Sequence, residues 1–491
     1  MNEESQKPAT ANEDRYLAER KLRRVAGPVL LWGLGVGSVI SGEFFGWNFG
    51  MNAGGWGGLL IATAIMATLY ATMMMSIAEM STAMPVAGGP YAFARRAIGR
   101  TGGYITGLAV VIEYVLAPAV IAVGIGGYVA DISPVFQPDV VAFVAYVIFV
   151  AINLLGVKES LRTLLVITVV SVAVLIIWGL AMAPNFSVDN LLDITPEDGG
   201  SRFLPFGLGG ILAALPAAGW FYLAIEDVPL AAEETADPAR DLPKGMLLAM
   251  GSLIVFSMIS LFIAPGAAGA EALATSGNPL PQAADEVYGR GWVYWLTTVV
   301  GLTGLIASFF SIIYAYSRQI FALSRAGYLP TWLSKTNRRH TPHWALIVPG
   351  IVGFLTIQVV DFFNTRGAPA GEDPPIATGD LLIQLAVFAA LVSYVMMMAS
   401  HFILRRDEPD MERPYRTPGA PVTPAVALGL SVLAMISSLF YQPQVVFMVL
   451  GVLVIYLLGL AYYWFYSRHH LVADAPEEEF AVITEAEKEV R

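Results

Sequence analysis

The chain has 491 residues, of which 56% are hydrophobic and only 14% are charged, and it contains no cysteine. Soluble globular proteins carry about 25% charged residues, so this composition excludes an ordinary water-soluble protein of two or three domains. The lack of cysteine excludes disulfides, thiolate catalysis and cysteine-ligated metals. Much of the formal net charge of −11 lies in the acid-rich residues 474–491. Residues 1–19 are polar, so we expect no signal peptide and predict that the first span directs insertion.

Apolar blocks recur along the chain, and a block of about 20 such residues is long enough to cross a membrane. Lys and Arg test the assignment because they gather in cytoplasmic loops. They precede span 1 and follow every even-numbered span, as Arg95 and Arg405 do, whereas the opposite loops hold only Arg202, Arg290 and Arg366. The sequence therefore predicts a multi-pass inner-membrane protein with both termini in the cytoplasm. The twelve spans are predicted near residues 28–52, 57–81, 101–129, 137–156, 160–183, 206–232, 243–266, 291–321, 343–362, 379–403, 421–440 and 444–467.

Spans 1 and 6 carry helix-breaking residues at mid-membrane depth. Span 1 holds glycines from Gly33 to Gly46, and span 6 runs from Gly207 through Pro216 to Pro229. Interrupted helices at matching positions of two halves are typical of inverted-repeat transporters, with the substrate site at the breaks. Close helix packing and a proline kink explain the same residues, so the pattern alone leaves both interpretations open.

Four carboxylates fall inside the predicted spans: Glu43 in span 1, Glu113 in span 3, and Glu226 with Asp227 in span 6. A charge at the bilayer centre costs about 2.5–3.5 kcal/mol on insertion scales, so such residues usually face a cavity and have a function. No Lys or Arg lies deep in any span to pair with them, which favours a cationic ligand. Glu226 and Asp227 also lie near a span end, where water would solvate them, whereas Glu43 has apolar or aromatic neighbours on both sides.

Aromatic residues are concentrated in the same segments. Their faces attract cations, so together they predict a cage around a bound cation, although packing in the core or at the membrane interface explains any single one of them. They are Phe44, Phe45, Trp47, Tyr114, Trp220, Phe221, Tyr222, Phe309, Phe310, Tyr314 and Tyr394.

Four motifs resemble those of the amino acid–polyamine–organocation (APC) superfamily, and the resemblance covers residues 25–467. They are the glycine-rich break at 37–45, the loop at 78–91, the start of span 5 at 156–160, and residues 232–243. The resemblance implies an all-α membrane protein with a five-plus-five inverted repeat and with spans 1 and 6 unwound around the substrate. The implied regions are a cytoplasmic tail (1–24), a twelve-helix transporter domain (25–467, with repeats at about 28–183 and 206–403 and extra helices at 421–467) and an acidic cytoplasmic tail (468–491).

Within this superfamily the chain is most similar to the ethanolamine permeases, through residues 41–48, 219–227 and 277–281. Amino acid carriers of this fold present span-1 amides to a substrate carboxylate. Glu43 stands at the matching position here, where it would repel a carboxylate and attract an ammonium group. We therefore predict a secondary transporter that imports a small amine, ethanolamine first, by alternating access. The alternative is a permease for a zwitterionic or cationic amino acid, which a protonated Glu43 would allow.

The charges within the spans, the aromatic clustering and the resemblance together indicate site residues. The substrate-binding set is Ser41, Gly42, Glu43, Phe44, Glu113, Tyr114, Trp220, Tyr222, Phe309 and Tyr394. The gating or coupling set is Glu226, Asp227, Ser171, Ser308 and Ser311. Many proton-coupled relatives carry a lysine in span 5 where Ser171 stands here, so H⁺ and Na⁺ both remain open as coupling ions.

Other classes of protein fit poorly. The five histidines lie at or beyond predicted span ends and no phosphate-binding loop is present, so the sequence lacks the residue constellation of an enzyme. A receptor would usually add a soluble signalling domain, and a channel would not need two broken helices with acids in opposite halves. We expect a small-molecule substrate and the lipid bilayer as partners, with no cofactor, metal or nucleic acid; the oligomeric state stays open.

Overall fold

The computed structural model describes residues 26–86, 88–133, 135–155, 160–337, 339, 341–367, 376–440 and 443–471. This part of the chain is helical and contains no strands beyond two isolated bridges. The predicted N-terminal tail, residues 472–491 of the acidic tail and the motif at 156–159 lie outside it.

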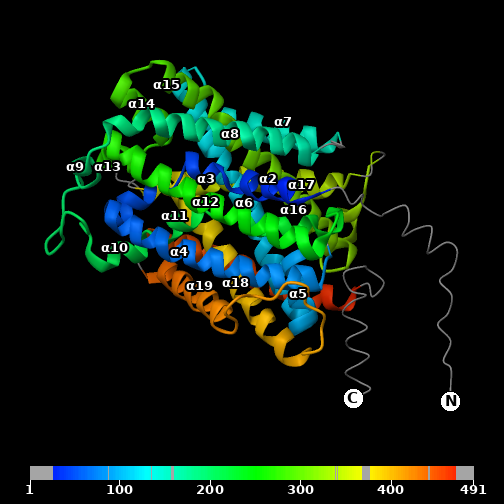
Figure 1. The fold of residues 1–491 in the computed structure, drawn as a ribbon. Coiled ribbons are helices and arrows are strands. Elements are labelled where there is room, and N and C mark those ends of the chain that lie inside the picture. Colours follow the sequence, from blue (N-terminus) through cyan, green and yellow to red (C-terminus); the bar gives the residue numbers. More distant parts are fainter. Residues whose placement is uncertain are drawn as a thin grey trace, which may run out of the picture.

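The helices follow one another with short connections (Figure 1). In the first half they are α2 (Pro28–Val39), α3 (Ser41–Phe44), α4 (Phe49–Ala83), α5 (Gly89–Ile98), α6 (Arg100–Ile132), α7 (Pro138–Leu154), α8 (Ser160–Met182), η1 (Ala183–Asn185) and α9 (Val188–Leu191). The middle holds α10 (Gly207–Ala213), α11 (Leu215–Trp220), η2 (Ile225–Glu234), α12 (Pro238–Ala268), α13 (Ala270–Leu273) and α14 (Pro279–Tyr288). The rest are α15 (Trp292–Trp295), η3 (Leu296–Val300), α16 (Leu302–Arg325), η4 (Thr331–Ser334), α17 (His343–Gly367), α18 (Thr378–Asp407), α19 (Val422–Phe440), α20 (Pro443–Phe465) and η5 (Ser467–His469).

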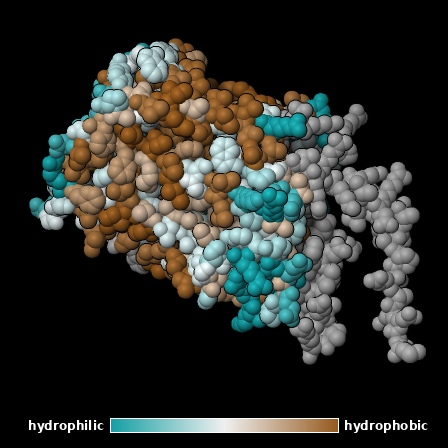
Figure 2. All heavy atoms as spheres, in the orientation of Figure 1, coloured by the Kyte–Doolittle hydropathy of each residue, from teal (hydrophilic) through white to brown (hydrophobic). Residues whose placement is uncertain are grey.

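Nine helical stretches of the described chain are long and apolar enough to cross a membrane. Three shorter apolar helices, at Pro28–Val39, Pro138–Leu154 and Val422–Ser438, fall on predicted spans 1, 4 and 11. Every predicted span thus overlaps one or more helices, and that all twelve cross the bilayer stays a prediction. Figure 2 shows hydrophobic residues over most of the visible flank and hydrophilic ones gathered at the end near α5.

The structure places a turn inside the first predicted span. Residues 28–52 were expected to form one span, but the helical residues end at Phe44, residues 45–48 form a turn, and α4 begins at Phe49. The predicted gap between spans 1 and 2, at residues 53–56, coincides with a kink in α4. Gly55 has φ +70° there, a left-handed conformation that glycine adopts without steric cost.

The arrangement places the two interrupted segments together in the interior. α6 and α18 pack along each other and are the most deeply buried of the long helices. α2 packs against α8, α12, α16 and η2, while α10 and α11 pack against α4. The residues between α2 and α4 therefore meet the residues around η2 inside the bundle rather than at its lipid-facing surface.

Candidate substrate site

The two helix breaks touch each other through their backbones. A Cβ atom added to Gly42 in α3 would lie 2.6 Å from the carbonyl oxygen of Trp220, the last residue of α11. The indole nitrogen of Trp220 donates a hydrogen bond to the Phe45 carbonyl oxygen at 2.9 Å. The rings of Trp47 and Phe221 stack at 5.8 Å between centroids. Glycine at position 42 is thus required by this close approach, and the break in span 1 is held directly against the break in span 6.

The break in span 6 combines three local features. Pro216 stands in the first turn of α11, where its missing N–H costs nothing. Residues 221–224 then form a turn, and Ala224 adopts a left-handed conformation with φ +74°. Such a conformation is uncommon outside glycine and is typical of functional sites. η2, a 3-10 helix, follows and carries Glu226 and Asp227.

Glu43 lies next to this contact and is fully buried. Neither of its carboxylate oxygens has a hydrogen-bond partner among the described residues. Its backbone carbonyl accepts a hydrogen bond from the Ser260 hydroxyl of α12 at 3.1 Å. Tyr222, which Glu43 influences electrostatically, is hydrogen-bonded to Ser257 on the same helix at 2.8 Å. α12 therefore provides a hydroxyl-bearing face near Glu43, and the sequence analysis did not include Ser257 or Ser260.

A second acidic group lies between the helices and consists of Glu113, Glu226 and Asp227, which interact electrostatically with one another. All three are buried, so Glu226 and Asp227 do not lie at a solvated helix end. Tyr394 of α18 donates a hydrogen bond to Glu226 Oε1 at 2.9 Å, and the Tyr70 hydroxyl of α4 lies 3.2 Å from that of Tyr394. No hydrogen bond of ordinary geometry reaches the Glu113 or Asp227 carboxylate from the described residues, although the side chains of Tyr114 and Ser38 lie beside Asp227.

Tyr114 joins this group because it interacts with Asp227. The structure thus brings together five predicted residues from three separate spans. Tyr70 belongs with them and was not predicted. It is the lone tyrosine within the apolar sequence of α4, and this could have marked it as a candidate.

These acids have no basic partners. No ion pair to Glu43, Glu113, Glu226 or Asp227 is formed by a Lys, Arg or His of the described residues. The same residues include no cluster of three His, Asp or Glu side chains that could hold a metal ion. A buried charge without a partner is costly, so a proton or the positive group of a ligand has to neutralise these carboxylates.

The predicted coupling serines divide into two sets. Ser308 accepts a hydrogen bond from the Ser41 amide at 3.0 Å and donates to the Gly37 carbonyl at 2.9 Å, while Ser311 pairs with Ser38 at 2.7 Å. These bonds fasten α16 to both sides of the span-1 break. Ser171 instead bonds to Thr303 at 3.1 Å and to its own helix, so it is not hydrogen-bonded to Ser308 or Ser311.

The predicted aromatic residues are likewise spread over different contacts. Phe44 packs against Gly304 of α16, and its carbonyl accepts a hydrogen bond from Tyr128 at 2.7 Å. Phe309 contacts Tyr146 and Phe149 of α7, with ring centroids 5.0 and 5.6 Å apart. Phe309, which belongs to α16, thus packs against α7. For this residue the contacts agree with core packing, the alternative to a place in a cation-binding cage. Trp220 and Tyr222 remain at the breaks.

Four backbone amides at the span-1 break already have acceptors. The amide of Ser41 bonds to Ser308, that of Glu43 to the Ile40 carbonyl, that of Phe45 to the Ser41 carbonyl, and that of Gly46 to the side chain of Asn48. A substrate carboxylate would have to displace these bonds to use any of the four, whereas the Glu43 carboxylate has no hydrogen-bond partner among the described residues.

A mostly apolar helical bundle with two touching helix breaks and buried acids is typical of a membrane transporter. The profile described as "Amino acid permease" matches residues 30–474. The chain belongs to the amino acid permease family. The APC resemblance is thereby confirmed at the level of the family, and the chain is a multi-pass membrane transporter.

Named relatives of this permease differ in substrate. It is 28% identical to the branched-chain amino acid permease BcaP of Bacillus subtilis, over 92% of this chain and 95% of the relative. It is 24% identical to the methylthioribose transporter of Bacillus subtilis, over 89% and 92%. It is 26% identical to the aromatic amino acid transport protein AroP of Escherichia coli, over 75% and 79%. Two of these three names specify amino acids, so they favour the amino acid alternative over ethanolamine, which stays a prediction.

Proposed function

We propose that this permease carries a small amine-bearing molecule across the membrane by alternating access, with the substrate bound where the breaks of spans 1 and 6 meet. Membership of the amino acid permease family, together with the names of BcaP and AroP, supports amino acids as the first substrate class. The inverted repeat and the cytoplasmic location of both tails belong to the same proposal.

The observation that carries this proposal is the buried, unpaired carboxylate of Glu43 beside the contact of Gly42 with Trp220. Leaving one charge of a buried pair without its partner is strongly unfavourable. The ammonium group of a bound amine neutralises Glu43 and gains charge-assisted hydrogen bonds. The neighbouring rings of Trp47, Phe221 and Tyr222 add a favourable surface for a cation.

Ethanolamine is the second candidate, and one specific observation favours it. The amides of Ser41, Glu43, Phe45 and Gly46 all have acceptors. None of these four N–H groups is therefore free to bind a substrate carboxylate. An amine that lacks a carboxylate needs none of them, and its hydroxyl has Ser41 and Tyr222 within the same segments. An amino acid, whose ammonium group would still pair with Glu43, requires rearranged amides to bind its carboxylate.

The second acidic group suits a coupling role. Glu113, Glu226 and Asp227 are buried together without a base, so a proton shared among them relieves their repulsion. Ser308 and Ser311 are engaged with the span-1 break, and they support sodium binding less well. We therefore favour H⁺ over Na⁺ as the coupling ion.

Calorimetric titration of the purified full-length protein tests the proposal. Leucine, phenylalanine, ethanolamine and choline are titrated into the native protein, into Glu43→Gln, and into Asp380→Asn as a matched buried-acid control. We expect at least one primary amine to bind. Glu43→Gln should weaken its binding by about tenfold or more, since truncating one partner of a buried charge pair costs roughly 2–5 kcal/mol. Asp380→Asn should bind as the native protein does.

The outcomes separate the candidates. Binding of leucine or phenylalanine without ethanolamine establishes the amino acid class, and the reverse establishes ethanolamine. Native-like binding by Glu43→Gln, or no binding of any amine, contradicts the proposed site.

A further inference from the structure

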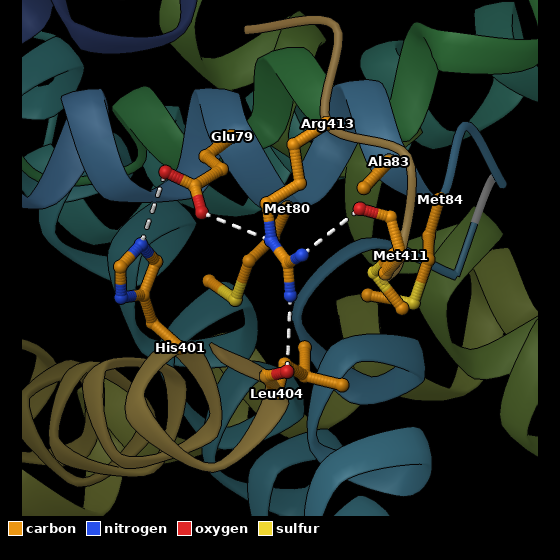
Figure 3. A pocket seen from close by; sticks show the side chains of 8 residues that line it. All are labelled: Glu79, Met80, Ala83, Met84, His401, Leu404, Met411 and Arg413. Carbon is orange, nitrogen blue, oxygen red and sulfur yellow. Dashed lines mark hydrogen bonds and ion pairs between the residues drawn. The ribbon is translucent and has the colours of Figure 1, made fainter. Parts of the chain in front are cut away.

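A buried carboxylate with several charged and polar partners lies outside the candidate substrate site, near the end of α4. Glu79 Oε1 accepts a hydrogen bond from Arg405 Nε at 2.8 Å and lies 3.3 Å from Arg413 Nε. Its Oε2 accepts from Arg405 Nη2 and from the Thr417 amide, both at 2.6 Å, and lies 3.5 Å from His401 Nε2. The Glu79 side chain is only 2% exposed. Figure 3 shows Glu79 between His401 and Arg413.

These partners come from two segments other than α4. Arg405 and His401 belong to α18, whereas Arg413 and Thr417 belong to residues 408–421, which connect α18 to α19 and are called the strap below. One buried carboxylate thus joins three parts of the chain at the end where the arginines gather.

The strap has few other ionic attachments. Glu408, at its start, forms a bidentate pair with Arg96 of α5, with the shortest distance 2.6 Å. The Arg413 guanidinium also donates to the carbonyl oxygens of Leu404, Glu408 and Met411, as Figure 3 shows for Leu404 and Met411. These bonds shape the strap internally and tie it to the end of α18. Among the described residues that hold the strap ionically, only Glu79 belongs to α4.

The attachment depends on a single negative charge. Burial lowers the pKa of Arg413, which the Glu79 carboxylate opposes and Arg405 reinforces. An arginine side chain keeps its charge in proteins even so. If the Glu79 carboxylate is removed, Arg405 and Arg413 face each other with no anion between them and repel each other. The ionic attachment of the strap to α4 therefore rests on this one carboxylate.

The same two helices reach the candidate substrate site. Tyr70 of α4 and Tyr394 of α18 lie 3.2 Å apart, and Tyr394 donates to Glu226. This contact lies about 15 Å from Glu79 along the helices, at 1.5 Å per residue. α4 and α18 are therefore joined at two levels, once beside the buried acids and once at Glu79.

We propose that Glu79 is a latch that keeps the strap on α4 while the basic end of the permease is closed, and that releases the strap when the permease opens towards that end. The latch goes beyond the proposed function and rests on its alternating-access cycle. Release breaks the contacts of Glu79 with Thr417 and Arg413 and leaves the bidentate pair with Arg405 in place.

Thiol labelling tests the latch, because the chain has no cysteine and one introduced thiol is the only target. Met84, 2% exposed, lines the small cavity beneath the strap together with Met411. We expect Met84→Cys to react slowly with a membrane-impermeant maleimide in the purified full-length protein. Adding Glu79→Gln should accelerate the reaction by about tenfold or more, because a buried ion network then loses its only anion. Arg413→Gln, which spares Glu79 and Arg405, should accelerate it in the same direction.

Two controls make the result decisive. Asp189→Asn removes an exposed ion pair with Arg202 and should leave the rate unchanged. Ala390→Cys reports on the buried middle of α18 and should stay slow in the Glu79→Gln background. An unchanged rate at Met84→Cys overturns the latch, and so does equal acceleration at Ala390→Cys, which would mean that Glu79 only maintains the fold. The labelling uses no substrate, so a failure of the permease to bind amines does not affect this readout.

Discussion

At the scale of single residues, the buried carboxylates carry the functional argument. Glu43, Glu113, Glu226 and Asp227 were recognisable in the sequence because acids are expensive in a membrane, and all four are buried in the structure. Two of the neighbouring hydroxyls, those of Tyr394 and Tyr114, were predicted as well. Tyr70 and Ser260 were not, because they come from distant segments with no motif of their own. The sequence thus predicted which groups need neutralising, but only some of the hydroxyls around them.

The Tyr394 hydroxyl gives a test at this scale. Tyr394→Phe leaves Glu226 Oε1 without its donor, and an unsatisfied buried polar group costs about 1–3 kcal/mol, more when it is charged. Tyr456→Phe is the matched control, since it removes an ordinary bond from a buried tyrosine to the Ala389 carbonyl. We expect thermal unfolding of the solubilised protein to show a larger decrease in stability for Tyr394→Phe. Equal decreases would contradict a special role for the contact with Glu226.

At the scale of elements, clusters of glycine and proline marked both breaks in the sequence. They did not reveal whether these residues interrupt the helices or let them pack closely. The pattern allowed either a break or close packing, and the structure combines the two, since Gly42 lies against the Trp220 carbonyl. The short helices α5 and α14 and the turn at residues 45–48 were missed. Their ends depend on tertiary contacts, which hydropathy does not record.

Gly42→Ala tests the contact between the breaks. The new methyl group would lie 2.6 Å from a backbone oxygen that no rotamer change can move, and overpacking of this kind costs about 1–3 kcal/mol. We expect weaker amine binding together with a lower unfolding temperature. Gly251→Ala is the control, because nothing lies within 4 Å of its Cβ position, and it should be neutral or slightly stabilising. Native-like binding by Gly42→Ala would show that the breaks are not in this close contact.

At the scale of the whole molecule, the class of protein followed from composition and hydropathy alone. The long apolar helices and the family match agree with that prediction. The substrate did not follow, because the candidate site is assembled from distant segments of the chain, among them spans 1 and 6 and α12, and the names of the relatives specify different molecules. The overall charge pattern predicts how the helical bundle is oriented in the membrane, with the basic loops on the cytoplasmic side.

Single cysteines measure that orientation. Ser201 and Thr336 are exposed at opposite ends of the bundle according to the charge pattern. An impermeant maleimide should label Ser201→Cys in intact cells, whereas Thr336→Cys should react only after the membrane is permeabilised. The reverse result would place the basic loops outside.

The central claim is that this permease moves an amine through the site at Glu43, and uptake into liposomes reconstituted with the full-length protein tests it most directly. Radiolabelled leucine, phenylalanine and ethanolamine are supplied outside, with the interior negative and the exterior acidic, since each positive charge gains about 2.3 kcal/mol per 100 mV on entry. The account predicts saturable accumulation of at least one of these amines, and loss of that accumulation in Glu43→Gln. Uptake no faster than in protein-free liposomes, or undiminished uptake by Glu43→Gln, would contradict it.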